Sequence, residues 1–366
     1  MTDPASLFAS FRQILIVKPS SLGDILHAFP LVTALRAARP DLFIDWVANG
    51  EYVDLVRRHP DIRNVWAFPR REFGRRDFFG KLGTLRKNLG GVHYDVIVDA
   101  QGLLRSALIA RMALRGQRDG SVVGFGNARE GASLFYSRTV PVPETLSTPI
   151  HAVKRNLLFL PALGLEMLSP PETVLRYGPE DFGFLDALLE SLDLPSGKPY
   201  MVIHPGAKRE SKKWPSSYYS ELIRKMIGRG YPMPVLLGDR GEADLLSEIQ
   251  IRSGFPVPIL AGGLPLDLLP LFLGRASFFV GNDSGPLHMA ALSGVPTVSF
   301  YGSSDPGRTG PWGPTSRNRV LREAIACSPC GDFVKDCSHM TCQVTLTPER
   351  TLDEIARLLD DERIVP

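Results

Sequence analysis

Residues 280–292 read Val-Gly-Asn-Asp-Ser-Gly-Pro-Leu-His-Met-Ala-Ala-Leu, and this stretch decides the fold of the chain. A short apolar run, residues 276–280, precedes the turn and is typical of a buried strand. An amphipathic segment and a second strand, residues 297–301, follow it. We therefore expect a strand, a turn, a helix and another strand, which is the repeating unit of α/β domains.

The turn Asp283-Ser284-Gly285 lies where such a unit can bind an anion. It follows the carboxyl end of a strand and opens a helix, so free backbone N–H groups and the positive end of the helix dipole are available there. Open α/β sheets bind their ligands at this edge. His288 lies one helical turn beyond Ser284, so both side chains are expected to point toward the turn. The alternative is an ordinary turn in which Asp283 or Ser284 only caps the helix.

Length and composition limit the class of protein. The chain has 366 residues, which is too long for one ordinary core, so two domains are expected. Its 44% hydrophobic and 22% charged residues are typical of a soluble globular protein, and a net charge of +3 is too small to indicate a nucleic-acid binder. No apolar run approaches the roughly 18 residues of a membrane-spanning helix. No basic region precedes the first apolar stretch, as it would in a secretory signal, so we expect a cytoplasmic protein.

The four cysteines fall in one short segment with the spacing C-x2-C-x6-C-x4-C, at Cys327, Cys330, Cys337 and Cys342. This spacing is compatible with a zinc site or with two disulfides. A reducing cytoplasm disfavours disulfides. A small zinc-held loop and a loop of free thiols remain the alternatives, and either role is structural rather than catalytic.

Strands alternate with helices along the whole chain, which is the pattern of doubly wound α/β domains. Upstream of the opening stretch, apolar runs predict strands at residues 14–17, 42–47, 65–68, 94–98, 121–125, 200–203, 234–237 and 256–260. Pro30 lies in the helical pattern after the first strand and is expected to bend or split that helix.

The Pro-rich segment 169–180 is the best candidate for a domain boundary. We predict an N-terminal domain of residues 1–175 and a C-terminal domain of residues 176–346. Both are expected to be Rossmann-like and to face a central cleft. Residues 347–366 contain the last helical pattern, and we expect them to pack back on the N-terminal domain.

Polar side chains follow several of the predicted strands. The first strand runs into residues 18–24, Lys-Pro-Ser-Ser-Leu-Gly-Asp, and the fourth runs into Asp99-Ala100-Gln101-Gly102. In two facing domains such loops would converge on one cleft. The second domain supplies a cation, helix N-termini and acids able to bind hydroxyls, at Lys212, Glu242, Asp283, Ser284, Gly285 and His288. This set suits a nucleotide diphosphate sugar.

Several known motifs are absent from the sequence. There is no G-x-G-x-x-G after the first strand and no G-x-x-x-x-G-K-[ST], so neither dinucleotide binding nor a P-loop fits. There is also no Asp-x-Asp pair, so we expect no metal cofactor. A leaving diphosphate would depend on lysine and backbone dipoles instead. Lys212 and Lys213 are adjacent, and either could reach the diphosphate.

Residues 70–76 read Arg-Arg-Glu-Phe-Gly-Arg-Arg. Arginine pairs suit the bidentate binding of carboxylate or phosphate, so this segment is a candidate anion site. A solvated basic loop is the equally weighted alternative. Arg75 and Arg76 could also hold the protein at anionic lipid headgroups.

The chain resembles the lipopolysaccharide heptosyltransferase family (glycosyltransferase family 9), whose members have the two-domain GT-B fold. The motifs that carry this resemblance are Lys18-Pro19-Ser20-Ser21-Leu22-Gly23-Asp24, Asp99-Ala100-Gln101-Gly102-Leu103, Ser133-Leu134-Phe135-Tyr136, Lys212-Lys213-Trp214-Pro215 and Asp283-Ser284-Gly285 with His288. They span nearly the whole chain in the family's order. The second and third motifs resemble the heptosyltransferase I branch in particular.

The resemblance implies an inverting glycosyltransferase that moves L-glycero-D-manno-heptose from ADP-heptose to Kdo of the lipopolysaccharide inner core, on a Kdo-lipid A acceptor. Asp24 matches the family's catalytic base, although alone it would be interpreted as a helix cap. A helix N-terminus beside Asp24 would lower its pKa, and burial would raise it. The resemblance implies no cofactor, and a location peripheral to the cytoplasmic face of the inner membrane.

The resemblance also assigns binding residues. On the donor, Lys212 matches the lysine at the phosphates, Glu242 the acid near the ribose and Asp283 the acid that holds the heptose. Ser284, Gly285 and His288 lie beside Asp283. Residues expected to bind the acceptor are Ser20, Ser21, Arg70, Arg71 and Arg129. The alternatives are a heptosyltransferase II-like enzyme with another acceptor, a sugar-nucleotide-binding protein without turnover, and a sugar-nucleotide epimerase.

Overall fold

The computed structural model describes residues 11–72, 74, 77–114, 117, 120–145, 148–167, 169, 172–194, 197–331 and 337–362. Residue contacts divide the chain into two compact units, Met1–Arg176 and Tyr177–Pro366. The division falls one residue beyond the boundary expected from the sequence. Each unit is built around one sheet, as predicted.

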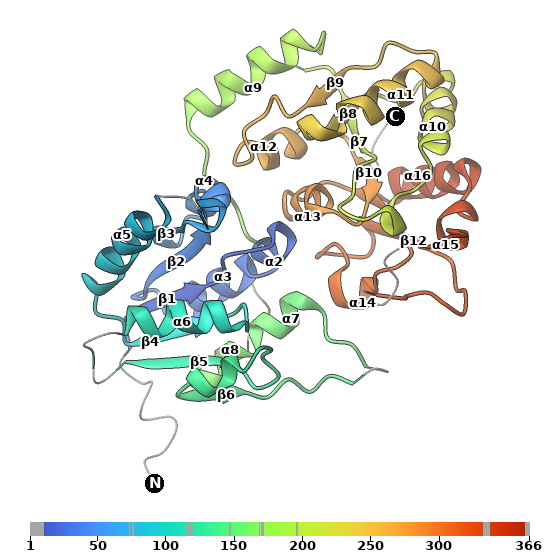
Figure 1. The fold of residues 1–366 in the computed structure, drawn as a ribbon. Helices are drawn as coiled ribbons and strands as arrows, with labels where there is room; N and C mark the ends of the chain where they lie inside the picture. Colours follow the sequence, from blue (N-terminus) through green and yellow to red (C-terminus); the bar gives the residue numbers. More distant parts are fainter. Residues whose placement is uncertain are drawn as a thin grey trace. The chain divides into compact units, whose positions relative to one another are not determined.

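The sheet of the first unit is parallel and has the order β3-β2-β1-β4-β5-β6 (Figure 1). Its strands are β1 Gln13–Val17, β2 Phe43–Asn49, β3 Ile62–Phe68, β4 Val96–Asp99, β5 Ser121–Phe125 and β6 Arg138–Val140. This is the strand order of a Rossmann fold, and it reverses between β1 and β4. The last four residues of β1 are buried, since a central parallel strand is covered by helices on both faces.

Pro30 splits the first helical pattern, which confirms the prediction made for it. The chain forms α2 Leu22–Leu26 and then α3 Phe29–Ala38, with Pro30 in the first turn of α3, where its missing N–H costs no helical hydrogen bond. The other helices of this unit are η1 Gly50–Tyr52, α4 Val53–Arg57, η2 Arg70–Glu72, α5 Phe78–Gly90, α6 Leu104–Ala113, η3 Ala132–Phe135, α7 Ala152–Leu157 and α8 Phe159–Ala162.

The second unit repeats the architecture. Its parallel sheet has the order β12-β11-β10-β7-β8-β9, which is the same Rossmann order when counted from β7 (Figure 1). The strands are β7 Tyr200–His204, β8 Met233–Gly238, β9 Ile259–Ala261, β10 Phe279–Asn282, β11 Thr297–Tyr301 and β12 Asn318–Arg322. The helices are α9 Pro179–Ser191, η4 Glu210–Lys212, α10 Ser216–Gly228, η5 Arg240–Glu242, α11 Ala243–Ser253, α12 Leu269–Gly274, α13 Gly285–Leu292, α14 Pro306–Thr309, α15 Thr341–Val344 and α16 Pro348–Glu362.

The core of the second unit ties together the two loops that carry its polar residues. Trp214 stacks on Phe300 with 4.2 Å between ring centroids, and its backbone N–H donates to Asn282 Oδ1 at 2.9 Å. The Asn282 amide donates to the carbonyl of Pro205 at 2.7 Å. Asn282 is fully buried, so these bonds fix the end of β10 against the segment that follows β7.

The C-terminal helix α16 is placed differently from the prediction. It packs on α10, and its buried residues, such as Leu352 and Ile355, join the hydrophobic cluster around Trp214 in the second unit. The expectation that residues 347–366 pack on the first domain is therefore wrong for the described part of that segment. The physical reason is that α10 and β11 leave an apolar surface that α16 covers within its own unit.

No helix among the described residues combines the length and the apolar character needed to cross a bilayer.

Candidate functional site

Asp24 lies in α2, immediately after the loop that leaves β1. Its Oδ2 atom accepts hydrogen bonds from the backbone N–H of Ser21 at 3.0 Å and from the Ser21 hydroxyl at 2.7 Å. Ser21 is the N-cap of α2, so Asp24 is the third helical residue and its carboxylate reaches back to the cap. Among the described residues, no donor bonds Oδ1 of Asp24. This oxygen remains available to a ligand.

Lys18 gives Asp24 a buried positive neighbour. Its ammonium donates to the carbonyl of Ala100 at 2.9 Å, which joins the loops after β1 and β4. Burial lowers the pKa of Lys18, and the charge of Asp24 partly opposes this. For Asp24, burial would raise the pKa, but Lys18, both hydrogen bonds from Ser21 and the charge of His27 together lower it. Asp24 is therefore a carboxylate at neutral pH.

The residues expected to bind the acceptor are only partly brought together. Arg70 donates to the Ser20 hydroxyl at 3.1 Å, and the backbone N–H of Ser20 donates to Oε1 of Gln101 at 3.3 Å. Arg71 is exposed and instead lies 3.7 Å from Glu51 in an ion pair. Arg129 lies in the loop after β5, where its backbone N–H donates to the carbonyl of Gly102 at 2.9 Å. Arg75 and Arg76, expected at lipid headgroups, lie outside the described residues.

Asp283 is the centre of the polar cluster in the second unit. Lys212 donates to its Oδ2 at 2.5 Å, and the Ser304 hydroxyl donates to the same oxygen at 2.5 Å. Its other oxygen, Oδ1, lies 3.3 Å from the Tyr301 hydroxyl and 3.5 Å from Nε2 of His288. Lys212 comes from the segment after β7 and Asp283 from the end of β10, and the sheet order reverses between these two strands. The cluster thus occupies the switch point of the second sheet.

The charge state of Asp283 follows from these contacts. Burial would raise its pKa, but the hydrogen bond with His288 and the charges of Lys212 and His288 lower it far below the ordinary value. Asp283 is only 4% exposed at its side chain, whereas Lys212 is 24% exposed. The ammonium of Lys212 is therefore the part of the pair that solvent and an anionic ligand can reach.

The turn before α13 does not act as an ordinary helix cap. Ser284 is the N-cap residue, but its side chain makes no capping hydrogen bond. Within the described part of the chain, the Ser284 hydroxyl has no hydrogen-bond partner at all, although it is buried. Gly285 starts the helix, and Pro286 follows it in the first turn. The N-terminal end of α13 therefore keeps backbone donors for a ligand.

Glu242 lies in a different part of the second unit, at the end of β8. Its Oε2 accepts a hydrogen bond from the backbone N–H of Asp239 at 2.9 Å. A Cβ at Gly206 would come within 1.9 Å of the Glu242 carboxylate, so only glycine allows the segment after β7 to pass this close. Glu242 therefore borders the same segment that carries Lys212. Lys213, the alternative to Lys212, pairs with Glu210 instead.

The cysteine segment shows neither of the cross-linked states considered from its spacing. All four cysteines are free thiols, and Cys342 is the buried one. Burial raises the pKa of Cys342, and the neighbouring cysteines raise it further. Within the described ranges, no three His, Cys, Asp or Glu side chains are arranged to hold one metal ion.

Sequence reasoning missed four contributors to these clusters. Lys18 and Gln101 lie in sequence motifs that indicate no role for them, and no sequence pattern singles out Tyr301 or Ser304. A usable signal existed for each, since all four lie at or just beyond the carboxyl end of a predicted strand. What the sequence did not reveal is which of them turns toward Asp24 or Asp283.

Two Rossmann sheets in one chain, each with a charged cluster at its switch point, are the architecture of the GT-B fold. The family model described as glycosyltransferase family 9 (heptosyltransferase) matches residues 82–343. The chain is 30% identical to lipopolysaccharide heptosyltransferase 1 of Pseudomonas aeruginosa, over 95% of this chain and 98% of that protein. It is 29% identical to lipopolysaccharide heptosyltransferase 1 of Escherichia coli K12, over 82% and 91%.

A solved structure agrees with the sequence comparison. The E. coli heptosyltransferase WaaC with ADP matches with a TM-score of 0.73 and 27% identity, over 94% of this chain and 99% of that chain. The chain belongs to glycosyltransferase family 9. Its fold is the GT-B fold, as expected from the sequence.

Proposed function

We propose that the chain transfers L-glycero-D-manno-heptose from ADP-heptose to Kdo of the lipopolysaccharide inner core, with inversion at the anomeric carbon. The observation that carries the proposal is that each sheet places a partly buried charged cluster at its own switch point. Asp24 and Lys18 form one cluster, and Asp283 and Lys212 form the other. Membership of the family and the similarity to heptosyltransferase 1 proteins support it.

The second unit has the groups that an ADP-sugar donor needs. Lys212 supplies a reachable cation for the diphosphate, and the N-terminal end of α13 supplies backbone donors. Asp283 is ionised and buried, so it can accept hydrogen bonds from sugar hydroxyls. Glu242 borders the same segment and is assigned to the adenosine ribose. Ser284 and His288 lie beside Asp283 on the first turns of α13.

The first unit has the base. Asp24 is held through Oδ2 by Ser21, so Oδ1 can take the proton of the attacking acceptor hydroxyl. A bond then forms between the acceptor oxygen and the anomeric carbon as the bond from that carbon to the β-phosphate oxygen breaks. The electron pair of the broken bond leaves with ADP. The lowered pKa of Asp24 keeps its carboxylate unprotonated and able to accept a proton, although it also makes Asp24 a weaker base.

Lys212 has a second part in this reaction. The departing ADP gains negative charge, and a positioned ammonium stabilises that charge more in the transition state than in the bound donor. Before the donor binds, Asp283 neutralises Lys212 and holds it in place. The reaction requires the donor on the second unit to reach Asp24 on the first.

The acceptor is assigned to the first unit. Ser21 bonds the Asp24 carboxylate and Arg70 bonds the neighbouring Ser20. From there, Arg70 can meet the acidic acceptor sugar. Since that acceptor is built on a membrane lipid, we place the protein at the cytoplasmic face of the inner membrane, in peripheral contact with it.

The test is a transfer assay with purified protein, ADP-heptose and Kdo-lipid A, in which product mass is measured. We expect one heptose on Kdo-lipid A. A second acceptor that already carries the first heptose tests the heptosyltransferase II-like alternative, and transfer to that acceptor alone would replace the acceptor proposed here.

ADP-heptose incubated without any acceptor tests the remaining alternatives. An epimerase would change the donor sugar under these conditions, whereas the proposed enzyme should return it unchanged. ADP-heptose binding with no transfer to either acceptor would indicate a binding protein and overturn the proposal.

A further inference from the structure

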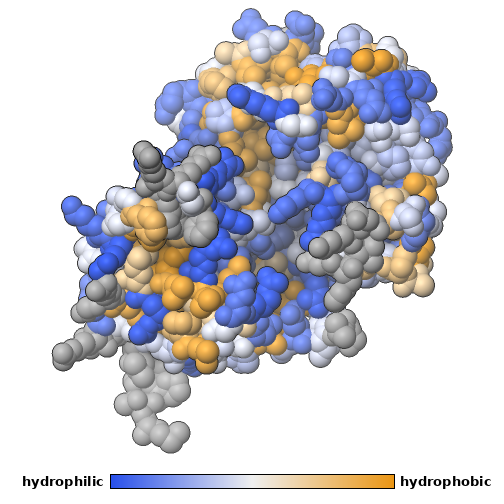
Figure 2. Space-filling model, viewed as in Figure 1, coloured by the Kyte–Doolittle hydropathy of each residue, from blue (hydrophilic) through white to orange (hydrophobic). Residues whose placement is uncertain are grey.

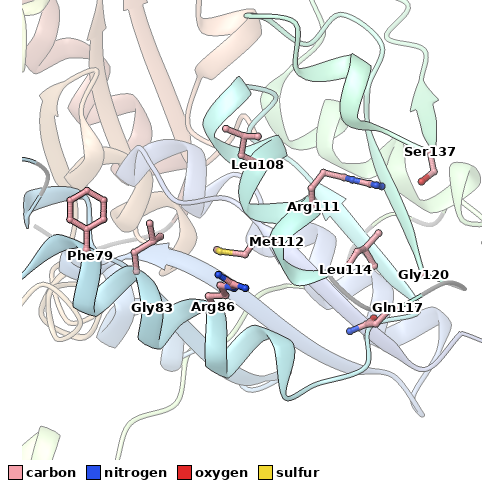
Figure 3. A pocket seen from close by; sticks show the side chains of 11 residues that line it. Phe79, Gly83, Arg86, Leu108, Arg111, Met112, Leu114, Gln117, Gly120 and Ser137 are labelled. Atoms are coloured by element: carbon pink, nitrogen blue, oxygen red, sulfur yellow. The ribbon is translucent and has the colours of Figure 1, made fainter.

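A groove lined by apolar side chains, arginines and a few other polar groups runs between α5 and α6 of the first unit. Two cavities form it, of about 920 and about 520 Å³, and they share Leu82, Leu108 and Met112. Figure 3 shows the larger cavity, with Phe79 from α5 and Leu108 from α6 on its walls. Both volumes fall in or near the range of roughly 300–1,000 Å³ that small-molecule sites occupy. No residue assigned to the donor lies here.

At Gly83, the wall that α5 contributes to the larger cavity carries no side chain. Gly83 lines the larger cavity, and a Cβ built there meets no atom within 4 Å. Glycine in a helix interior lowers helix stability relative to other residues, so this position is costly for α5. Gly83 lowers the stability of α5 and leaves the groove open at this position. Both effects are consistent with a groove that binds a ligand.

The walls of the groove combine apolar side chains with arginines. Arg86 on α5, Arg105 and Arg111 on α6 and Arg70 just before α5 all line it, and none of the described lining residues is acidic. Arg86, Arg105 and Arg111 have no acidic partner among the residues that the structure describes. Their aliphatic stems can cover apolar surface while the guanidinium groups remain in water or bind an anion.

Large apolar side chains are also exposed on the elements of this part of the first unit. Phe79 is 79% exposed, Leu134 is 86% exposed and Leu108 is 49% exposed. Leu134 belongs to η3, which contacts α6. Figure 2 shows apolar side chains gathered in this part of the first unit with strongly hydrophilic ones beside them. Exposed apolar side chains flanked by arginines are the pattern of a surface that lies on an anionic bilayer.

We propose that the groove between α5 and α6 takes an acyl chain of an anionic membrane lipid, with its arginines at the headgroups, so that this face of the first unit rests on the bilayer. Arg70 connects the groove to the acceptor loop, since it lines the smaller cavity and donates to Ser20. A protein seated in this way presents the loop that carries Asp24 next to lipid-borne acceptors. The biological purpose rests on the proposed function, but binding of lipid does not.

The first experiment measures sedimentation of the full-length protein with vesicles. The vesicles contain phosphatidylglycerol in phosphatidylcholine, or phosphatidylcholine alone. We expect binding to the anionic vesicles that weakens with salt, and little binding to the neutral ones. Gly83→Leu fills the groove, and we expect it to weaken binding about tenfold. Replacing Arg86 and Arg111 with glutamate should remove the preference for anionic vesicles.

Gly80→Leu is the matched control, because it makes the same change on the same helix. A Cβ at Gly80 also meets nothing within 4 Å, and Gly80 does not line either cavity. This variant should bind vesicles at least as well as the wild type. Both leucine variants should unfold at the wild-type temperature or above, since leucine favours helix more than glycine does. Thermal unfolding therefore separates a blocked groove from a damaged fold.

The proposal is overturned if the wild type ignores anionic vesicles, or if Gly83→Leu and Gly80→Leu bind them equally. A wild-type dimer that Gly83→Leu converts to a monomer would assign the groove to a second copy instead. Transfer to a water-soluble, deacylated acceptor should be unchanged in Gly83→Leu, while transfer to the acceptor in vesicles should fall. If the wild type transfers no heptose to the soluble acceptor, the proposed function is wrong. The sedimentation experiment still tests lipid binding by the groove in that case.

Discussion

At the scale of single residues, the contact between Lys212 and Asp283 distinguishes two adjacent lysines. Lys212→Ala removes a cation that can reach the donor diphosphate, and it also leaves Asp283 buried without its ion-pair partner. One charge-assisted contact to a developing anion is worth about 3 kcal/mol, so we expect kcat/KM for ADP-heptose to fall roughly 100-fold or more. Steady-state kinetics with the Kdo-lipid A acceptor would measure this loss.

Lys213→Ala is the control for that variant. Lys213 pairs with Glu210, whose side chain is 81% exposed, so removing it should change kcat/KM by less than about threefold. Equal losses in the two variants would show that the diphosphate does not distinguish the lysines. The assignment of Lys212 would then have to be given up.

The protonation state of His59 is expected to affect the stability of the first unit. It is 1% exposed, and burial lowers its pKa to about 4, with the charges of Arg176 and Arg36 acting in the same direction. Its Nδ1 accepts a hydrogen bond from the backbone N–H of Asp61 at 3.2 Å, which requires an unprotonated nitrogen.

Because the unfolded chain protonates near pH 6.5 and the folded one near pH 4, the unfolded state binds more protons between these values. The free energy of unfolding should therefore fall as the pH falls through this window, by on the order of 3 kcal/mol at most. Denaturant unfolding of the wild type and of His59→Gln at several pH values would measure it. The variant should lose this part of the pH dependence, and an unchanged slope would contradict it.

Much of the residue list was predictable, but not the contacts. The acids and hydroxyls of the candidate site lie just after strands, and the strands can be recognised in the sequence as apolar runs. The positions of these site residues could therefore be predicted from the sequence. The direction in which each side chain points could not be predicted in this way. Arg71 belongs to the same basic segment as Arg70, yet it pairs with Glu51 while Arg70 reaches Ser20. The difference arises from tertiary packing, which a local pattern does not contain.

At the scale of elements, α16 shows which neighbouring elements an amphipathic helix packs against. Ile355 is fully buried in the cluster around Trp214 of the second unit. Ile355→Ala leaves a cavity there, and we expect it to lower the free energy of unfolding of that unit by about 3 kcal/mol. Hydrogen exchange should show faster exchange in β7, β10 and α10, with the first sheet unchanged.

Asp353→Ala is the control on the same helix, because Asp353 is exposed. It should alter exchange in neither sheet. Faster exchange in the first sheet of Ile355→Ala would instead support the packing expected from the sequence.

Two strands and one helix that were not predicted lack a strong local signal in the sequence, for different physical reasons. Edge strands β6 and β12 carry arginines and other polar residues, since they are not covered on both faces as the central strands are. Helix α5 has three glycines in 13 residues, Gly80, Gly83 and Gly90, so its intrinsic preference for helix is weak. Contacts with β3 and α6 hold it in place, and those are long-range.

At the scale of the whole molecule, the proposed function assigns different halves of one reaction to the two units. The first contributes Asp24, and the second contributes the cluster around Asp283. This division predicts that binding and transfer can be separated by a single substitution. Asp24→Asn keeps the size of the side chain and its hydrogen bond from Ser21, but it removes the proton acceptor.

We expect Asp24→Asn to lower kcat about 1,000-fold, within the range of 10² to 10⁴ typical for loss of a general base. Its Kd for ADP, measured by calorimetry, should match the wild type within a factor of about two, because the groups assigned to the nucleotide all lie in the second unit. Asp41→Asn is the control in the first unit, since Asp41 pairs with Arg39 and should affect neither quantity. If Asp24→Asn weakens ADP binding as strongly as it slows transfer, Asp24 belongs to the donor site and another group must take the proton.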